Sequence, residues 1–180
     1  MTTDPGPADA GSRDEVDDLV EAWSRERPDL DVTPMRVLSR VTRLARHLDR
    51  QRAAAFSAHG LETWEFDVLA ALRRAGGTNQ LSPGRLLRET MVTSGTMTNR
   101  VDRLAARGLV ERDLHPGDKR GVLVRLTPAG RLAVDAALAD LLAAEQRLVN
   151  GLDDQEQSSL AAALRRLLLV YGEPEEPSGS

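Results

Sequence analysis

Short polar and basic side chains gather between residues 94 and 103, where their types and spacing suit contact with nucleic acid. The set comprises Ser94, Thr96, Thr98, Asn99 and Arg103. On a helix, hydroxyl, amide and guanidinium groups can form hydrogen bonds with base edges in the major groove of DNA. Serine, threonine and asparagine also cap helices, so a purely structural role is the alternative.

A second polar segment occupies residues 115–121 and includes Asp118, Lys119 and Arg120. Two short extended segments, 109–112 and 122–126, flank this group, so the pattern predicts a β-hairpin with a basic tip. An arginine at such a tip can enter the minor groove, where narrow A·T tracts concentrate negative potential. Asp118 can pair with an arginine and hold the tip in shape.

Apolar periodicity and capping signals predict the elements that position these groups. Ser82-Pro83 and Thr127-Pro128 each place a capping residue before a proline at the first helical position, and Asp153 caps the last helix. His59-Gly60 closes the second helix. We expect helices over residues 14–26, 34–59, 62–74, 82–89, 94–107, 127–150 and from 153 onward.

The order helix, short helix, tight turn, helix and two-stranded hairpin is that of a winged helix-turn-helix. The predicted fold is therefore mainly α with a small β-hairpin wing. A helix of ~10–12 Å diameter fits the major groove of B-DNA, and side chains near its N-terminus reach the bases. A winged fold that serves protein contacts instead is the alternative.

Composition narrows the class of protein further. The chain has 180 residues, enough for one domain with tails, and only 3% aromatic residues, which favours packed helices over a β-sandwich. It contains no cysteine, so disulfides and cysteine-ligated metals are excluded. No signal sequence and no apolar run of ~20 residues is found. We expect a cytoplasmic protein that does not contact a membrane.

Charge is distributed unevenly along the chain. The net charge is −4, and residues 1–31 carry ten acidic groups against three arginines. Residues 84–125 instead carry nine basic against five acidic groups. Because attraction to phosphate acts over about a Debye length, this basic middle can bind a polyanion despite the overall charge. A solvated, arginine-rich face is the alternative.

The sequence favours neither an enzyme nor a metalloprotein. It has neither of the glycine-rich phosphate-binding motifs and no Ser–His–Asp arrangement. His47, His59 and His115 are scattered and match no zinc motif, although a metal site assembled only in the fold is the alternative to surface roles. We expect no catalytic residue, no metal site and no cofactor.

Four motifs together resemble the MarR family of transcriptional regulators over residues 34–170. They are TSGTMTNRVDRL at 93–104, GLVER at 108–112, DKR at 118–120 and LTPAG at 126–130. The resemblance implies a homodimer whose interface is formed by the first and last helices of each subunit. It also implies binding to pseudo-palindromic operators, usually repression, and release of double-stranded DNA when a small anionic or phenolic ligand binds.

The resulting division of the chain places the dimerisation helices at both ends. The expected parts are a disordered tail at 1–13, N-terminal helices at 14–60, the DNA-binding domain at 61–127, C-terminal dimerisation helices at 128–171 and an acidic tail at 172–180. Apolar stripes at residues 37–48 and 160–168 agree with dimerisation, since each needs a partner surface. Both stripes being covered within one subunit is the alternative.

The additional helix at 14–26 resembles the urate-responsive, PecS-like subgroup of this family. The resemblance implies a ligand site formed by Trp23, Asp67, Arg100 and Arg112. Urate is a planar monoanion, so an indole can stack on its face and a guanidinium can pair with its edge. Asp67 would then pair with an arginine in the empty state and be repelled by the arriving anion.

Each of these four residues also has a structural interpretation. Trp23 can anchor the additional helix, Asp67 and Arg100 can form an ion pair between helices, and Arg112 can contact phosphate. A regulator that binds DNA without a small-molecule ligand and a winged-helix protein-interaction module are therefore the alternative functions.

The hairpin tip distinguishes a DNA-binding module from a protein-interaction module. We predict that Arg120→Ala lowers the affinity for DNA generally, because the tip loses its minor-groove cation. Titration of labelled duplex at fixed salt measures this effect. Unchanged affinity would favour the protein-interaction module.

Overall fold

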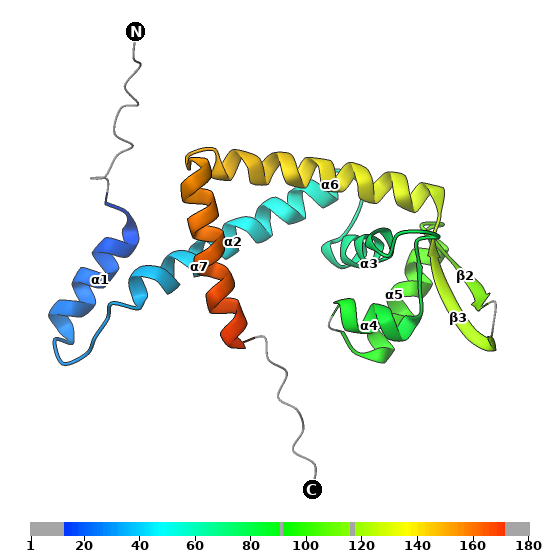
Figure 1. The fold of residues 1–180 in the computed structure, drawn as a ribbon, viewed down its shortest axis with the longest axis horizontal. Helices are drawn as coiled ribbons and strands as arrows, with labels where there is room; N and C mark the ends of the chain where they lie inside the picture. The colour runs from blue at the N-terminus through cyan, green and yellow to red at the C-terminus, as the bar shows by residue number, and fades with distance from the viewer. Residues whose placement is uncertain (1–12, 91, 116–117, 172–180) are drawn as a thin grey trace, which may run out of the picture. The chain divides into compact units, whose positions relative to one another are not determined.

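The computed structural model describes residues 13–90, 92–115 and 118–171, and the side chains of 114–121 and 171 lie outside this description. The tails expected at 1–13 and 172–180 also lie outside it, apart from residue 13. The chain divides into two compact units, Met1–Arg50 and Gln51–Ser180, and each is described by itself. Figure 1 shows the elements along the chain.

The first unit contains α1 (Glu15–Glu26) and most of α2 (Met35–Ser57), which continues into the second unit. Asp14 caps α1 by accepting the backbone N–H of Val16 at 2.8 Å. Its carboxylate also pairs with Arg40 of α2 at 2.8 Å, and this partner lowers the pKa of Asp14 to about 2. Val16 and Val20 are buried beneath these charges. The predicted start of this helix is confirmed.

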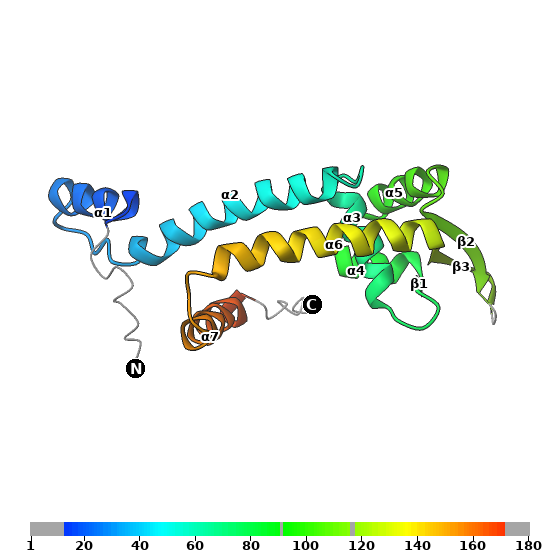
Figure 2. The ribbon, with the colours of Figure 1, turned by 90° about the horizontal axis from the view of Figure 1, so that it is seen from above.

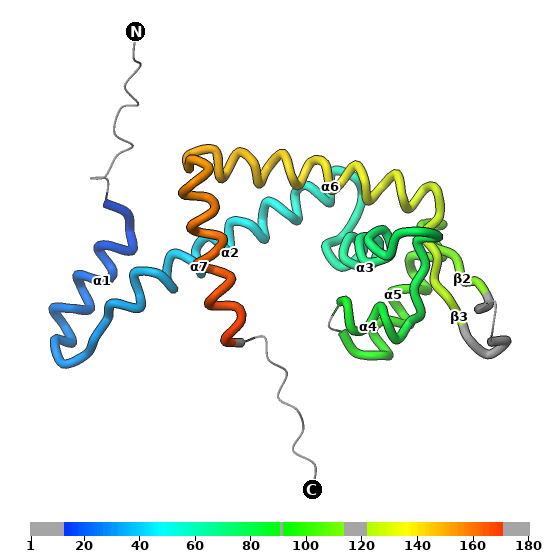
Figure 3. Tube along the Cα trace, in the orientation of Figure 1, coloured from blue at the N-terminus to red at the C-terminus, as the bar shows by residue number. Residues whose placement is uncertain are grey.

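The second unit contains five further helices, and the capping signals predicted at Thr127 and Asp153 are confirmed. Thr127 accepts the backbone N–H of Gly130 at 3.0 Å, and Asp153 accepts that of Glu156 at 2.8 Å. The helices are α3 (Thr63–Arg74), α4 (Pro83–Thr90), α5 (Ser94–Ala106), α6 (Pro128–Val149) and α7 (Asp154–Tyr171). In Figures 1 and 2, α3, α4 and α5 group beside the N-terminal half of α6. Figure 3 shows the sharp turn from α6 into α7.

The sheet is larger than predicted. It has three antiparallel strands in the order β1-β3-β2: β1 (Gln80–Leu81), β2 (Val110–His115) and β3 (Asp118–Leu126). The sequence carries no signal for β1, because two residues cannot show an alternating pattern. The strands also extend into the predicted loop 115–121, since backbone pairing tolerates its polar side chains. A register shift between Leu114 and His115 accommodates this extension.

One hydrophobic core joins these elements. Leu69 and Leu72 of α3, Leu86 of α4, and Met97 and Leu104 of α5 are almost completely buried in it. On α5, the buried residues Met97, Val101 and Leu104 recur at helical spacing and so share one face. In the described part of the chain, no helix is long and apolar enough to cross a membrane.

The first turn of α6 packs against the junction between α5 and β2 at Gly130. A Cβ atom at this position would overlap the carbonyl oxygen of Leu109, which is backbone and cannot rotate away. We predict that Gly130→Ala lowers the free energy of unfolding by about 1–3 kcal/mol, because the helix must shift to relieve the overlap. Urea denaturation followed by circular dichroism measures the change.

Gly84 provides the matched control for this substitution. It lies within α4, and a Cβ there would meet nothing within 4 Å. Gly84→Ala should leave stability unchanged or raise it by up to about 1 kcal/mol. Equal stabilities of the two variants would contradict the close approach at Gly130.

Candidate nucleic-acid interface and ligand site

The polar residues predicted to read DNA lie together on the surface of α5. All of them are exposed to solvent: Ser94, Thr96, Thr98, Asn99 and Arg103. The opposite face of the helix buries Met97, Val101 and Leu104 in the core. The apolar face therefore holds the polar face outward, as a helix that enters a groove requires.

Two of the predicted hydroxyls also make local contacts. Thr96 Oγ1 lies 2.9 Å from Thr93 Oγ1, and Thr98 Oγ1 donates to the carbonyl oxygen of Ser94 at 3.3 Å. Neither bond caps α5, because its N-cap residue Thr93 makes no side-chain hydrogen bond to the backbone of the first turn. A hydroxyl has one donor and two acceptor positions, so each group keeps capacity for a further partner.

Trp64 of α3 lies beside this surface and borders a hollow of about 420 Å³. The hollow is lined by Trp64, Gly95, Thr96, Asn99, Arg100 and Arg103. The Cζ atoms of Arg103 and Arg100 lie 4.7 and 5.4 Å from the centroid of the indole ring. Guanidinium groups at these distances are attracted by the ring face. Trp64 is partly buried against the core, and an apolar residue on a helix gives no signal in the sequence for a contact with arginines.

Glu65 joins α3 to the C-terminal end of α5. Its side chain is only 1% exposed, and its Oε2 accepts from Arg107 and from the backbone N–H of Glu62. Arg107 also donates to the carbonyl oxygen of Gly60 at 2.8 Å. A buried carboxylate is stabilised by this kind of charged, hydrogen-bonded partner. Glu65 occupies the third helical position after Glu62, a capping-box spacing that was visible in the sequence.

The predicted tip residues of the wing lie at the start of β3. Asp118, Lys119 and Arg120 belong to this strand, but their side chains lie outside the described residues. Arg112 of β2 pairs with Asp102 of α5 at 2.7 Å. This ion pair attaches the base of the wing to the second helix of the helix-turn-helix.

Three residues of the expected ligand site belong to the second unit, where each contacts a different partner. Asp67 pairs with Arg52 of α2 at 3.4 Å, so its partner is Arg52 and not Arg100. Arg100 lies over Trp64 and Arg112 pairs with Asp102. The sequence offered no signal for Arg52, because no spacing rule relates residues of two different helices.

A cavity of about 470 Å³ adjoins the Arg52–Asp67 pair. Its charged lining consists of Arg52, Asp67, Arg73, Arg74, Glu89 and Glu145. Arg73 pairs with Asp135 at 2.8 Å, and Arg74 pairs with Glu89 at 3.6 Å. Phe66, Val134, Leu138 and Leu141 complete an apolar wall. Apolar walls with a few charged groups are typical of small-molecule sites.

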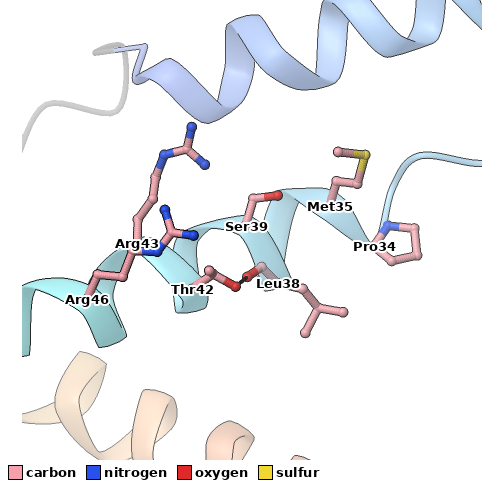
Figure 4. Close-up of a pocket in the computed structure, with 7 residues that line it drawn as sticks. All are labelled: Pro34, Met35, Leu38, Ser39, Thr42, Arg43 and Arg46. Atoms are coloured by element: carbon pink, nitrogen blue, oxygen red, sulfur yellow. Dashed lines mark hydrogen bonds between the residues drawn. The ribbon is translucent and has the colours of Figure 1, made fainter. Parts of the chain in front are cut away.

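The first unit contains Trp23 and a separate hollow along α2. The side chain of Trp23 is 46% exposed. Figure 4 shows the hollow, about 300 Å³ in volume, lined by Pro34, Met35, Leu38, Ser39, Thr42, Arg43 and Arg46. Arg43 pairs with Glu15 of α1, so one arginine of this hollow is already engaged.

Among the residues that the structure describes, no group of three or more His, Cys, Asp or Glu side chains could hold an ion. His59 pairs through Nε2 with Asp140 at 2.7 Å, and the side chain of His115 lies outside the description.

Two helices joined by a tight turn, with polar residues on the second and an antiparallel hairpin beside it, define a winged helix-turn-helix DNA-binding protein. Residues 59–121 match the family model described as MarR family. The chain is 35% identical over 153 residues to the HTH-type transcriptional regulator PecS of Dickeya dadantii, covering 85% of this chain and 92% of that protein. The chain belongs to the MarR family of transcriptional regulators, which are DNA-binding proteins and not enzymes.

Solved structures support this assignment. A mutant of Escherichia coli MarR complexed with operator DNA has a TM-score of 0.61 and 30% identity, over 77% of this chain and 99% of that one. A structure of Bordetella bronchiseptica BpsR, described as regulated in DNA binding by 6-hydroxynicotinic acid, has a TM-score of 0.54 and 30% identity, over 71% of this chain and 98% of that one.

The buried pair between Glu65 and Arg107 generates a stability prediction. Arg107→Ala should lower the free energy of unfolding by about 1.5–3 kcal/mol, because a buried carboxylate loses a charged hydrogen-bond partner. Urea denaturation measures the loss. Arg147→Ala, which removes an exposed arginine of α6, is the control and should change stability by less than about 0.5 kcal/mol. Equal effects of the two substitutions would argue against the importance of the pair.

Proposed function

We propose that this regulator acts as a homodimeric repressor that binds a pseudo-palindromic operator and releases it when a small anionic ligand, urate or a similar molecule, binds. The observation that carries the proposal is the exposed polar face of α5, which presents Asn99, Arg100 and Arg103 around one hollow. In this arrangement α5 enters the major groove, and Arg120 of the wing reaches the adjacent minor groove.

Exposed apolar side chains support the homodimer. On α7, Leu160, Leu167, Leu168, Leu169 and Val170 are between 44% and 76% exposed in the single chain. On α2, Val37, Val41 and Leu44 are 38–54% exposed. Exposed apolar side chains repeated along a helix mark an interaction surface, and a two-fold dimer matches operator half-sites about one DNA turn apart. The partner surface is therefore proposed to be a second copy of the same helices.

The arginines beside Asp67 are the groups that an anionic ligand would bind. The cavity is lined by Arg52, Arg73 and Arg74 and by three carboxylates, and Asp67 pairs with Arg52. An arriving anion would compete with Asp67 for Arg52 and repel the carboxylate. The resemblance to the urate-responsive subgroup makes urate the first candidate. BpsR is described as regulated by 6-hydroxynicotinic acid, which is also a small aromatic acid.

The proposed response passes from the ligand to α5 through α3. Asp67 and Trp64 are both on α3, and Trp64 contacts Arg100 of α5. The resemblance also assigns Trp23, Arg100 and Arg112 to the ligand, because an indole can stack on a planar anion and a guanidinium can pair with its edge. Tenfold weaker DNA binding requires the ligand to favour the non-binding state by only ~1.4 kcal/mol.

The experiment is a titration of the purified protein onto the DNA that flanks its own gene, with and without urate at one fixed salt concentration. We predict specific binding that saturating urate weakens at least tenfold. The Trp23→Leu and Arg52→Ala variants should bind the same DNA but should no longer release it when urate is added. Trp23→Leu removes the aromatic face on which urate stacks, and Arg52→Ala removes the cation that pairs with the anion. Arg147→Ala should respond as the unmodified protein does.

The outcomes separate the parts of the proposal. Specific binding that is indifferent to urate would retain the regulator and redirect the search to other small anions. A full response in Trp23→Leu would exclude the stacking role of Trp23. Binding no tighter than to random DNA would contradict the operator and favour the protein-interaction module.

A further inference from the structure

Trp64 brings two arginines of α5 to one place on the surface. The Cζ atom of Arg103 lies 4.7 Å from the indole centroid and that of Arg100 lies 5.4 Å from it. The two arginines are separated by less than one helical turn, so a single ring can contact both. Their guanidinium groups therefore gather at the edge of α5 that faces the N-terminus of α3.

Glu62 fixes the ring in this position. The Nε1–H of Trp64 donates to Oε2 of Glu62 at 2.6 Å, and Nη2 of Arg103 donates to Oε1 of the same carboxylate at 2.9 Å. These bonds hold the pKa of Glu62 below its ordinary value, with the indole bond as the larger cause. The carboxylate thus remains charged at neutral pH and orients both the ring and one guanidinium.

The chemistry of this cluster suits a phosphate group. Arginine has a long side chain with many rotamers, and holding its planar group in advance reduces the entropy lost on binding. The hollow beside the ring is lined by Gly95, Thr96 and Asn99 as well as the two arginines, so donors surround it. Glu62 is 59% exposed, and an exposed ion pair of this kind is weak and exchangeable.

We propose that Trp64 is a positioning residue for DNA binding: its indole holds Arg100 and Arg103 ready for one backbone phosphate, which replaces Glu62 as the partner of Arg103. The inference rests on the DNA-binding function proposed above and adds a residue from α3 to the interface. A contact of this kind is independent of base sequence, so its effect is on affinity and on salt dependence.

The experiment measures the affinity for a duplex at several salt concentrations. We expect Trp64→Leu to bind about tenfold more weakly at low salt, with the slope of log K against log salt reduced by about one for each bound protomer, since each phosphate contact contributes ~0.9. Trp64→Phe keeps a ring face and should retain most of the affinity. Glu62→Gln should bind a few-fold more tightly, because the competing charge is removed.

A double-mutant cycle separates positioning from a merely structural role. In the background of Arg100→Ala and Arg103→Ala, adding Trp64→Leu should cause no further loss, because the side chains that the ring positions are absent. Arg147→Ala serves as the control for removal of an exposed arginine and should leave the salt slope unchanged. Thermal unfolding of every variant reports whether the fold persists.

Three results would overturn the inference. One is a Trp64→Leu variant that retains the affinity and salt slope of the unmodified protein. Another is a Trp64→Leu substitution that lowers the affinity for DNA equally in the unmodified protein and in the Arg100→Ala, Arg103→Ala variant, which would assign Trp64 a structural role alone. The third is an unmodified protein that binds no duplex; this result is seen before any variant is compared, and it overturns the proposed function together with the inference.

Discussion

The buried carboxylate of Glu65 requires a cation, and its pair with Arg107 ties the C-terminal end of α5 to α3. A buried charge without a partner is costly, and Arg107 supplies the partner from the C-terminal end of α5 while also bonding the carbonyl oxygen of Gly60. The apolar face of α5 buries Met97 and Leu104 on the same side. With its C-terminal end tied to α3, α5 projects its polar N-terminal half outward, so the surface proposed to bind DNA depends on a residue that does not belong to it.

The elements of this fold were predictable where their signals are local. Asp14, Thr127 and Asp153 each cap a helix through a backbone N–H two or three residues away, so the sequence alone identifies the start. β1 was not predictable, because Gln80 and Leu81 become a strand only by pairing with Arg125 and Val124. The longer hairpin was missed for the same reason: its pairing depends on a partner strand, and its own composition is that of a loop.

In the candidate site, too, local features were predictable from the sequence and contacts between elements were not. Helical periodicity was sufficient to place Thr96, Asn99 and Arg103 on the exposed face of α5, because the inner face was evident from its apolar residues. The partners of the charged groups were not predictable. Arg52 pairs with Asp67 and Glu62 pairs with Arg103 across two helices, and the crossing of helices decides which side chains meet. The resemblance to a family supplied Asp67 and Arg100, but it could not supply the contacts that they make in this chain.

These contacts make α3 common to the two proposed sites. Asp67 borders the cavity and Trp64 borders the surface of α5, and the two residues are three positions apart on α3. The Arg52–Asp67 pair is 3.4 Å long, with side chains that are 34% and 42% exposed, so an anion can break it at little cost. The change needed for tenfold weaker DNA binding, ~1.4 kcal/mol, is within the range of one charged hydrogen bond. In the proposed response, exchange of the ion pair at Asp67 reaches Arg100 and Arg103 through Trp64, which lies about one helical turn away on the same face of α3.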